Sequence, residues 1–183
     1  MSRKLLKKII KELALVSGYT KDQEEQVEYT IRVVFFEIIK IILLLFIFKI
    51  IGYFNEGLTL LICMALTKPF IGGYHEKTQI KCFIATLLIA SMIIILSIRS
   101  KLDFFSIIVL DMISIFIVYN RAPILNDDMP ITKLELINKN RRIGITMTIL
   151  ASVISLIVFE IAEYSEIIVW TIFINASLMF NKK

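Results

Sequence analysis

The sequence predicts an all-α polytopic membrane protein with about six transmembrane helices. Two observations indicate this fold class. Of the 183 residues, 57% are apolar and 20% are charged, whereas soluble domains have about 45–50% apolar and about 25% charged residues. The apolar residues also gather in long runs, and the mean hydropathy is +0.80. The simplest explanation is that lipid surrounds this additional apolar surface. The composition therefore argues against a disordered chain, a disulfide scaffold or a soluble nucleic-acid binder.

Residues 1–32 are expected to form cytoplasmic and interfacial helices. Between residues 3 and 16 the apolar side chains recur on one helical face and the lysines lie largely on the other. This pattern predicts an amphipathic helix on the membrane surface rather than a signal peptide. A Ser-Gly pair at 17–18 should end that helix, and Thr20 with Gln23 forms a capping-box pattern that starts the next one.

Six apolar segments follow and are interpreted as the membrane-spanning part, residues 33–180, before a short cytoplasmic tail at 181–183. Several segments are shorter than the ~20 residues of a perpendicular span, so a partly re-entrant second segment is an alternative. We expect one membrane domain over residues 1–183. The segments lie at 33–51, 57–71, 83–98, 102–119, 143–161 and 166–180.

The distribution of Lys and Arg predicts the orientation. With a cytoplasmic N-terminus, 17 of the 21 basic residues lie on the inner side; the exceptions are Lys40, Lys49, Arg99 and Lys101. Basic residues gather in the cytoplasmic loops of membrane proteins. Both termini are therefore expected in the cytoplasm of a bacterial cell, with the helices in its plasma membrane. The net charge of +5 then needs no nucleic acid to explain it.

One stretch, KPFIGGYHEKTQIKC at 68–82, contains His75, the single histidine of the chain, and Cys82. It connects the second and third segments on the predicted cytoplasmic side. A thiolate is a strong nucleophile, and a neighbouring imidazole is the usual means of producing it. The positive charges of Lys77 and Lys81 favour the same anion.

Helix geometry limits how these two side chains can meet. On one unbroken helix, residues seven apart have Cα atoms about 10.5 Å apart, which is too far for a direct contact. His75 must therefore lie on a turn that folds back over the start of the next helix. Pro69 and the glycine pair at 72–73 are expected to supply the breaks.

Ordinary structural interpretations stand beside this one. A histidine in an interfacial loop and a cysteine at the start of a span are commonly non-catalytic, and Cys63, within an apolar run, is expected to be a small apolar filler. Two cysteines and one histidine are too few for a zinc site, so we expect no metal.

Asp111, in the middle of the fourth segment, could orient His75 or pair with Lys40. The simplest partner of Lys40 is Glu37, three residues away.

The chain resembles the AgrB (accessory gene regulator B) family, membrane peptidases of Gram-positive quorum sensing. The resemblance rests on Gly-Gly-Tyr-His at 72–75, six further residues and then Cys82. Length, span number, the basic amphipathic N-terminus and the Tyr-x-x-Ala-Pro sequence at 119–123 extend it along nearly the whole chain. One position differs from the pattern of the family. The family usually has Arg seven residues before the histidine, whereas this chain has Lys68, which keeps the charge but lacks the bidentate guanidinium.

The resemblance implies an activity and its residues. It implies that His75 and Cys82 are the catalytic pair of a cysteine endopeptidase that needs no cofactor, and that Gly73 is the motif glycine. The substrate would be an AgrD-like propeptide, cut through a Cys82 acyl-thioester and cyclised to a thiolactone or lactone autoinducing peptide. Backbone N–H groups of the glycine pair could form the oxyanion site. The residues expected to support binding or catalysis are Lys68, Gly72, Gly73, Lys77, Lys81, Asp111, Arg141 and Arg142.

Two rival functions remain open at this point. One is a non-catalytic membrane peptide exporter or a scaffold for a signalling system, and the other is an inactive relative that retains only the fold. The partners expected for the favoured function are the propeptide and membrane lipid. A homodimer would suit the short spans and the polar residues within them.

Overall fold

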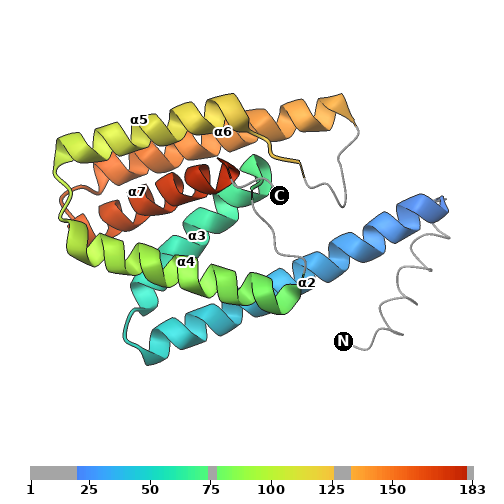
Figure 1. Ribbon diagram of the computed structural model, residues 1–183, viewed down its shortest axis with the longest axis horizontal. Coiled ribbons are helices and arrows are strands. Elements are labelled where there is room, and N and C mark those ends of the chain that lie inside the picture. Colours follow the sequence, from blue (N-terminus) through green and yellow to red (C-terminus); the bar gives the residue numbers. More distant parts are fainter. Residues whose placement is uncertain (1–19, 74–77, 126–132, 181–183) are drawn as a thin grey trace. The chain divides into compact units, whose positions relative to one another are not determined.

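The computed structural model describes residues 20–73, 78–125 and 133–180, and in this part of the chain the regular secondary structure is helical, without strands. Figure 1 shows the arrangement of its elements. The predicted interfacial helix at 3–16 lies outside the described residues. The elements are α2 (Lys21–Ile50), α3 (Phe54–Ile71), α4 (Gln79–Ser100), α5 (Phe104–Arg121), α6 (Leu134–Ile157), α7 (Ala162–Ser177) and the short 3₁₀-helix η1 (Leu178–Phe180).

The chain divides into two compact units, residues 1–43 and residues 44–183. The described part of the first unit is the larger part of α2, which begins at Lys21 directly after Thr20. This start confirms the position predicted from the capping pattern. Along the helix, Lys40 Nζ lies 2.6 Å from a carboxylate oxygen of Glu37, which confirms the expected ion pair.

Every predicted apolar segment corresponds to one helix. Four of the described helices, α3 to α6, are long and apolar enough to cross a membrane, as in a multi-pass membrane protein. The apolar half of α2 carries Glu37, Lys40 and Lys49, and α7 has only 16 residues. Helix α3 is continuous over 18 residues, and both the re-entrant alternative for this segment and the count of six spans stay predictions.

Helix α7 is the central helix of the second unit and packs against α3, α4, α5 and α6. Figure 1 shows it between α4 on one side and the α5–α6 pair on the other. A helix with buried side chains on all of its faces is stable only where other elements enclose it. Its buried residues are Ser165, Glu166, Ile167, Ile168, Val169, Thr171, Ile172, Ile174, Asn175 and Ala176.

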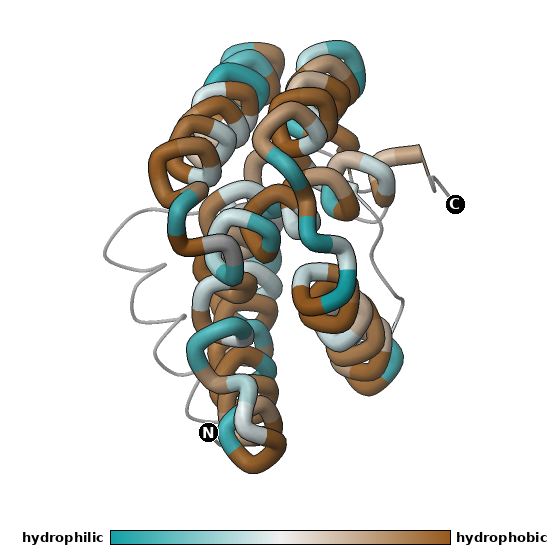
Figure 2. The backbone as a smooth tube through the Cα atoms, turned by 90° about the vertical axis from the view of Figure 1, so that its left-hand side faces the viewer, coloured by the Kyte–Doolittle hydropathy of each residue, from teal (hydrophilic) through white to brown (hydrophobic). Residues whose placement is uncertain are grey.

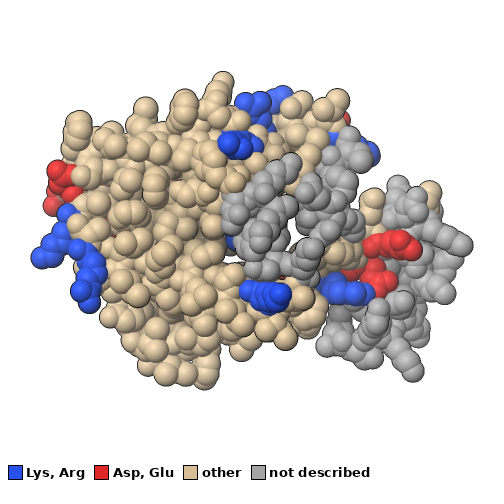
Figure 3. Space-filling view, viewed as in Figure 1, with Lys and Arg blue, Asp and Glu red and all other residues tan. Residues whose placement is uncertain are grey.

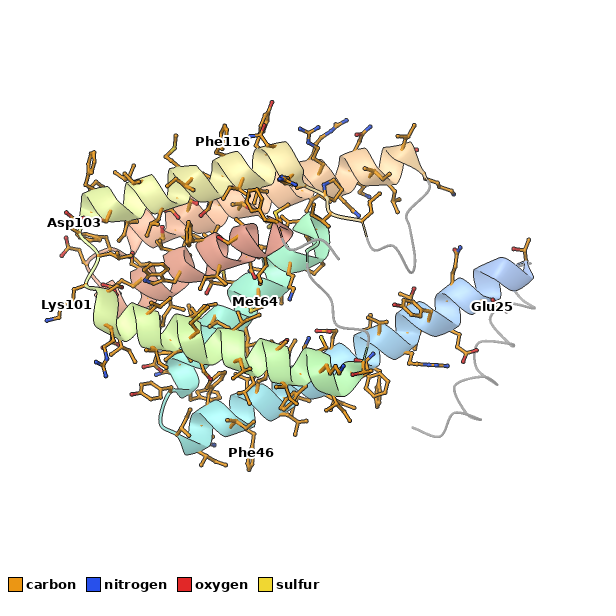
Figure 4. All side chains as sticks on the ribbon, in the orientation of Figure 1. Glu25, Phe46, Met64, Lys101, Asp103 and Phe116 are labelled. Atoms are coloured by element: carbon orange, nitrogen blue, oxygen red, sulfur yellow. The ribbon has the colours of Figure 1, made fainter. Side chains whose placement is uncertain are left out.

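The outer helices present apolar side chains outward. Phe46 and Phe116 are 62% and 68% exposed, and both point away from the bundle in Figure 4. Figure 2 shows that hydrophobic residues dominate the lengths of the helices. On the face in Figure 3, the charged side chains of the second unit lie toward the helix ends, and the surface between them is uncharged. This distribution suits a lipid environment.

Glycines allow two close helix contacts within the second unit. A Cβ atom added at Gly57 on α3 would lie 2.5 Å from the ring of Phe48, and one at Gly144 on α6 would lie 2.9 Å from Ile71 Cγ2. Small residues at such positions let helix backbones approach closely in membrane proteins. The contact at Gly144 fixes the end of α3, where the candidate site begins.

Candidate active site

Helix α3 ends at a glycine rather than at its proline. Pro69 lies inside the last turn of α3, and the helix continues to Ile71. Gly72 then adopts φ 75° and donates its N–H to Lys68 O at 3.0 Å. This positive φ favours glycine because it has no Cβ atom. The expectation that Pro69 breaks the helix was therefore wrong, because a proline lacks only one helical N–H and one missing bond does not end this helix.

The backbone after α3 pairs with the segment that follows α5. Ile124 donates its N–H to Ile71 O at 2.9 Å, and Gly72 forms a parallel β-bridge with Ile124. A Cβ atom at Gly72 would collide with Ile124 O. Gly73 has φ 126°, and a Cβ atom there would lie 4.0 Å from Leu178 O in η1. The glycine pair therefore lies where the ends of α3 and α5 and the C-terminal turn converge.

Two arginines hold the ends of the neighbouring helices at this convergence. Arg121, the last residue of α5, lies over the Phe180 ring at 4.5 Å. Arg141 on α6 lies over the Tyr119 ring at 5.5 Å and donates to Tyr119 O at 3.0 Å. A buried apolar cluster of Ile71, Val118, Ala122, Ala176 and Met179 completes the junction. The segment that contacts Gly72 is thus supported from α5, α6 and η1.

Cys82 lies in the first turn of α4 and is partly buried. Its N–H donates to Thr78 O at 2.9 Å, and its carbonyl accepts the Thr86 hydroxyl at 2.8 Å. Thr78 caps the helix through a bond from Lys81 N–H to its hydroxyl, at 3.4 Å. The first turn of a helix is where the helix dipole stabilises a negative charge. Cys63 differs, because it lies buried against Ile168 and Ile172, as expected for an apolar filler.

Comparison with known proteins identifies the family. Residues 2–179 match the family model described as "Accessory gene regulator B". The chain belongs to the AgrB family. It is 45% identical over 180 residues, covering 98% of this chain and 96% of the other, to a protein of Clostridium perfringens (strain 13 / Type A) named "Putative AgrB-like protein 1". No solved structure matches it. The AgrB family takes part in processing the agr quorum-sensing autoinducer and works with the AgrD propeptide.

The remaining site residues of this AgrB-family chain are distributed over several elements. His75 and Lys77 lie outside the described residues. Lys68 lies in the last turn of α3 and Lys81 at the start of α4. Arg142 is exposed on α6 beside Arg141. Among the residues that the structure describes, no group of three or more His, Cys, Asp or Glu could hold a metal ion.

Asp111 bonds to a residue that the sequence did not single out. One carboxylate oxygen lies 2.8 Å from Ser155 Oγ on α6. Both Asp111 and Ser155 are buried in the interior of the bundle. In this AgrB-family chain, Asp111 therefore joins α5 to α6.

Sequence reasoning also missed Ile124, Gly144 and Arg121 in the glycine junction. Their partners lie on other helices, and a single sequence contains no local signal for such contacts. The N–H of Gly72 was expected to be one of the groups that could form the oxyanion site, and this expectation needs a correction. This N–H already bonds to Lys68 O, because it closes the last turn of α3.

Proposed function

We propose that this AgrB-family chain is a membrane-embedded cysteine endopeptidase that cuts an AgrD-like propeptide. One observation supports this function above the others. Cys82 lies in the first turn of α4, and the connection before that helix begins at Gly72 and contains His75. Because α3 ends at Ile71 and α4 begins at Gln79, positions 75 and 82 do not belong to one unbroken helix, and the separation of about 10.5 Å that such a helix would impose does not apply.

The proposed reaction begins with proton transfer from the Cys82 thiol to His75. The thiolate attacks the carbonyl carbon at the junction of the propeptide and its C-terminal tail. As the new C–S bond forms and the peptide C–N bond breaks, the imidazolium returns the proton to the departing amine. The product is an acyl-thioester on Cys82 and a free tail.

Ring closure releases the enzyme in the second step. A Cys or Ser side chain of the propeptide attacks the thioester carbonyl, forms a thiolactone or lactone and restores the Cys82 thiol. Thioester exchange conserves the acyl bond energy, provided that the internal nucleophile reacts before water does. Cys82 is partly buried in the first turn of the apolar helix α4. This burial supports the proposed order of events, because it limits the access of water to the thioester.

The basic residues around the junction support recognition of a charged propeptide tail. Lys68 and Lys81 border the connection that contains His75 and Lys77, and the exposed Arg141 and Arg142 lie on α6. In the proposed orientation, this end of the helices faces the cytoplasm, where thiols stay reduced.

Co-expression with the candidate propeptide tests the proposal. The variants are Cys82→Ser and His75→Ala, with Cys63→Ser as the matched control, and C-terminal cleavage is followed by mass and by gel. We expect the first two variants to lose cleavage while inserting normally into the membrane, and Cys63→Ser to retain it. Normal processing by Cys82→Ser would contradict catalysis and favour the exporter or scaffold.

A further inference from the structure

Residues 122–125, which follow α5, form an extended segment with one edge paired to the end of α3. Ala122 has φ −73° and ψ 146°. Ile124 donates its N–H to Ile71 O, and its own oxygen faces Gly72, since a Cβ atom there would collide with it. Both backbone polar groups of Ile124 therefore point toward the end of α3.

The opposite edge of this segment has backbone groups of its own. In an extended backbone, consecutive residues direct their N–H and C=O groups to opposite edges. The C=O of Pro123 and the N–H of Leu125 therefore point away from the end of α3. Among the described residues, no backbone hydrogen bond includes either group. Both residues are half-buried, so an acceptor and a donor lie next to each other at the surface.

The position of these two groups matches the pattern of a parallel β-bridge. In such a bridge, one residue of the added strand donates its N–H to the C=O before the opposing residue and accepts the N–H after it. Pro123 and Leu125 flank Ile124 in this way, and the bridge of Ile124 with Gly72 is also parallel. An unpaired edge of this kind is a template for another extended chain.

The segment is fixed before a ligand arrives. Ile124 packs against the buried cluster of the glycine junction. Because side chains alternate along an extended segment, those of Pro123 and Leu125 lie on the other face, which is apolar. Arg121 and Arg141 hold the end of α5 directly before it. A preorganised edge binds an extended peptide at a lower entropic cost.

The edge is within reach of the proposed nucleophile. Gly73 adjoins the bridge, and only five residues lead from Gly73 to Thr78, which keeps the two Cα atoms within about 17 Å of each other. Cys82 follows Thr78 by about one helical turn, or about 6 Å. An extended peptide of about seven residues covers this distance.

We propose that the edge of residues 122–125 binds the propeptide as an added parallel β-strand, with Pro123 O and Leu125 N–H as its backbone partners. This inference rests on the proposed function and names the element that binds its substrate. Backbone bonds hold the peptide in an extended form, and the side chains of Pro123 and Leu125 contact its side chains. A lipid molecule has no row of N–H and C=O groups, so a peptide fits this edge better.

Photo-cross-linking in the full chain tests the proposal separately from catalysis. Leu125 is replaced by p-benzoylphenylalanine in a chain with Cys82→Ser, which is co-expressed with the candidate propeptide. Tyr119 is replaced in the same way as the matched control, because it is an exposed residue one turn after the exposed Phe116. We expect a cross-link to the propeptide from position 125 and none from position 119.

The outcomes separate this proposal from the peptidase activity. The edge is wrong if the propeptide copurifies with the chain but forms no cross-link at position 125, or if both positions react equally. Adducts with lipid alone at position 125 would also overturn it. A cross-link from position 125 combined with normal cleavage by Cys82→Ser would overturn the peptidase and leave the edge in place.

Kinetics in vesicles with a synthetic propeptide test the backbone bond itself. Leu125→Pro removes the N–H donor, whereas Leu125→Ala shortens the side chain and keeps the donor. Loss of one hydrogen bond predicts that KM rises about 2- to 10-fold more in Leu125→Pro than in Leu125→Ala. Equal values of KM in the two variants would contradict the bond to Leu125.

A modified propeptide keeps the test decisive if Leu125→Pro fails to fold. Synthetic propeptides with one N-methylated residue each are bound to the unaltered chain with Cys82→Ser. We expect one methyl group to weaken binding where those on the two neighbouring residues do not, because alternate N–H groups of an extended peptide face away from the edge. A series without any such sensitive position would overturn the added strand.

Discussion

Two features of the structure require a glycine at position 72. Its backbone has φ 75°, and the space of a Cβ atom is taken by Ile124 O. A residue held at such a φ without being glycine costs about 1–3 kcal/mol, and the collision adds to this because a backbone oxygen cannot rotate away. The pairing of the α3 end with the segment after α5 therefore depends on this position.

We expect Gly72→Ala to lower the thermal stability of the protein and to abolish propeptide cleavage. Gly52→Ala provides the control, because Gly52 has φ 86° but no atom within 4 Å of an added Cβ. The control thus has the backbone strain without the collision. Thermal unfolding in detergent and cleavage by mass measure the difference. Equal effects of the two substitutions would show that the contact with Ile124 has no special role.

Asp103 makes a pH-dependent contribution at the start of α5. Hydrogen bonds from the Ser106 side chain and N–H hold the pKa of its carboxyl below the ordinary value. A lowered folded-state pKa means stabilisation that is present above the unfolded-state pKa and lost as the pH falls through the folded-state pKa. The cap therefore requires the ionised form.

We expect Asp103→Ala to be less stable than the wild type at neutral pH, with the difference shrinking in acid. Thermal unfolding over a pH series measures it. Asp103→Asn is the control, because an asparagine can cap a helix at any of these pH values and its stability should not follow the same titration. A difference between wild type and Asp103→Ala that is constant with pH would contradict this role of the carboxylate.

At the level of the helices, Arg141 connects the polar start of α6 to the end of α5. Its guanidinium donates to Tyr119 O and lies over the Tyr119 ring, and Tyr119 precedes the segment that pairs with Gly72. We expect Arg141→Lys to reduce cleavage and to increase amide hydrogen exchange near Ile124. A lysine keeps the charge but lacks the planar donor group.

Arg142→Lys is the matched control for this prediction, because Arg142 is exposed at the adjacent position. If both variants lower cleavage equally and leave exchange unchanged, charge attraction to the substrate explains the effect. In that case Arg141 would not be a positioning residue.

The helices themselves were largely predictable from the sequence because apolar runs mark them. The runs at 57–71 and 83–98 became α3 and α4 with small extensions. The run at 143–161 predicted α6 less well. It corresponds only to the apolar part of the helix and does not include the polar turns that begin at Leu134. The position of Cys82 near the start of a helix was also predictable, whereas the contact of Gly72 with Ile124 depends on how α3 and α5 pack.

At the scale of the whole second unit, the fold fixes which turns share a side of the membrane. Glu166 at the start of α7 accepts bonds from Ser100 and Leu102 between α4 and α5. The α4–α5 and α6–α7 turns are therefore at one end, and Figure 4 shows Lys101 and Asp103 there. The other end has the glycine junction and the basic start of α6, which the charge rule places in the cytoplasm.

Cysteine labelling of intact cells tests this orientation in a chain without Cys63 and Cys82. We expect Lys101→Cys and Glu160→Cys to react with a membrane-impermeant maleimide, and Lys133→Cys and Arg142→Cys to react only after permeabilisation. The reverse pattern would show the opposite orientation in the membrane, with the candidate active site on the outer side. Different sides for Lys101→Cys and Glu160→Cys would contradict the packing of α7, since both turns adjoin the bonds of Glu166. The experiment therefore tests the orientation and the fold independently.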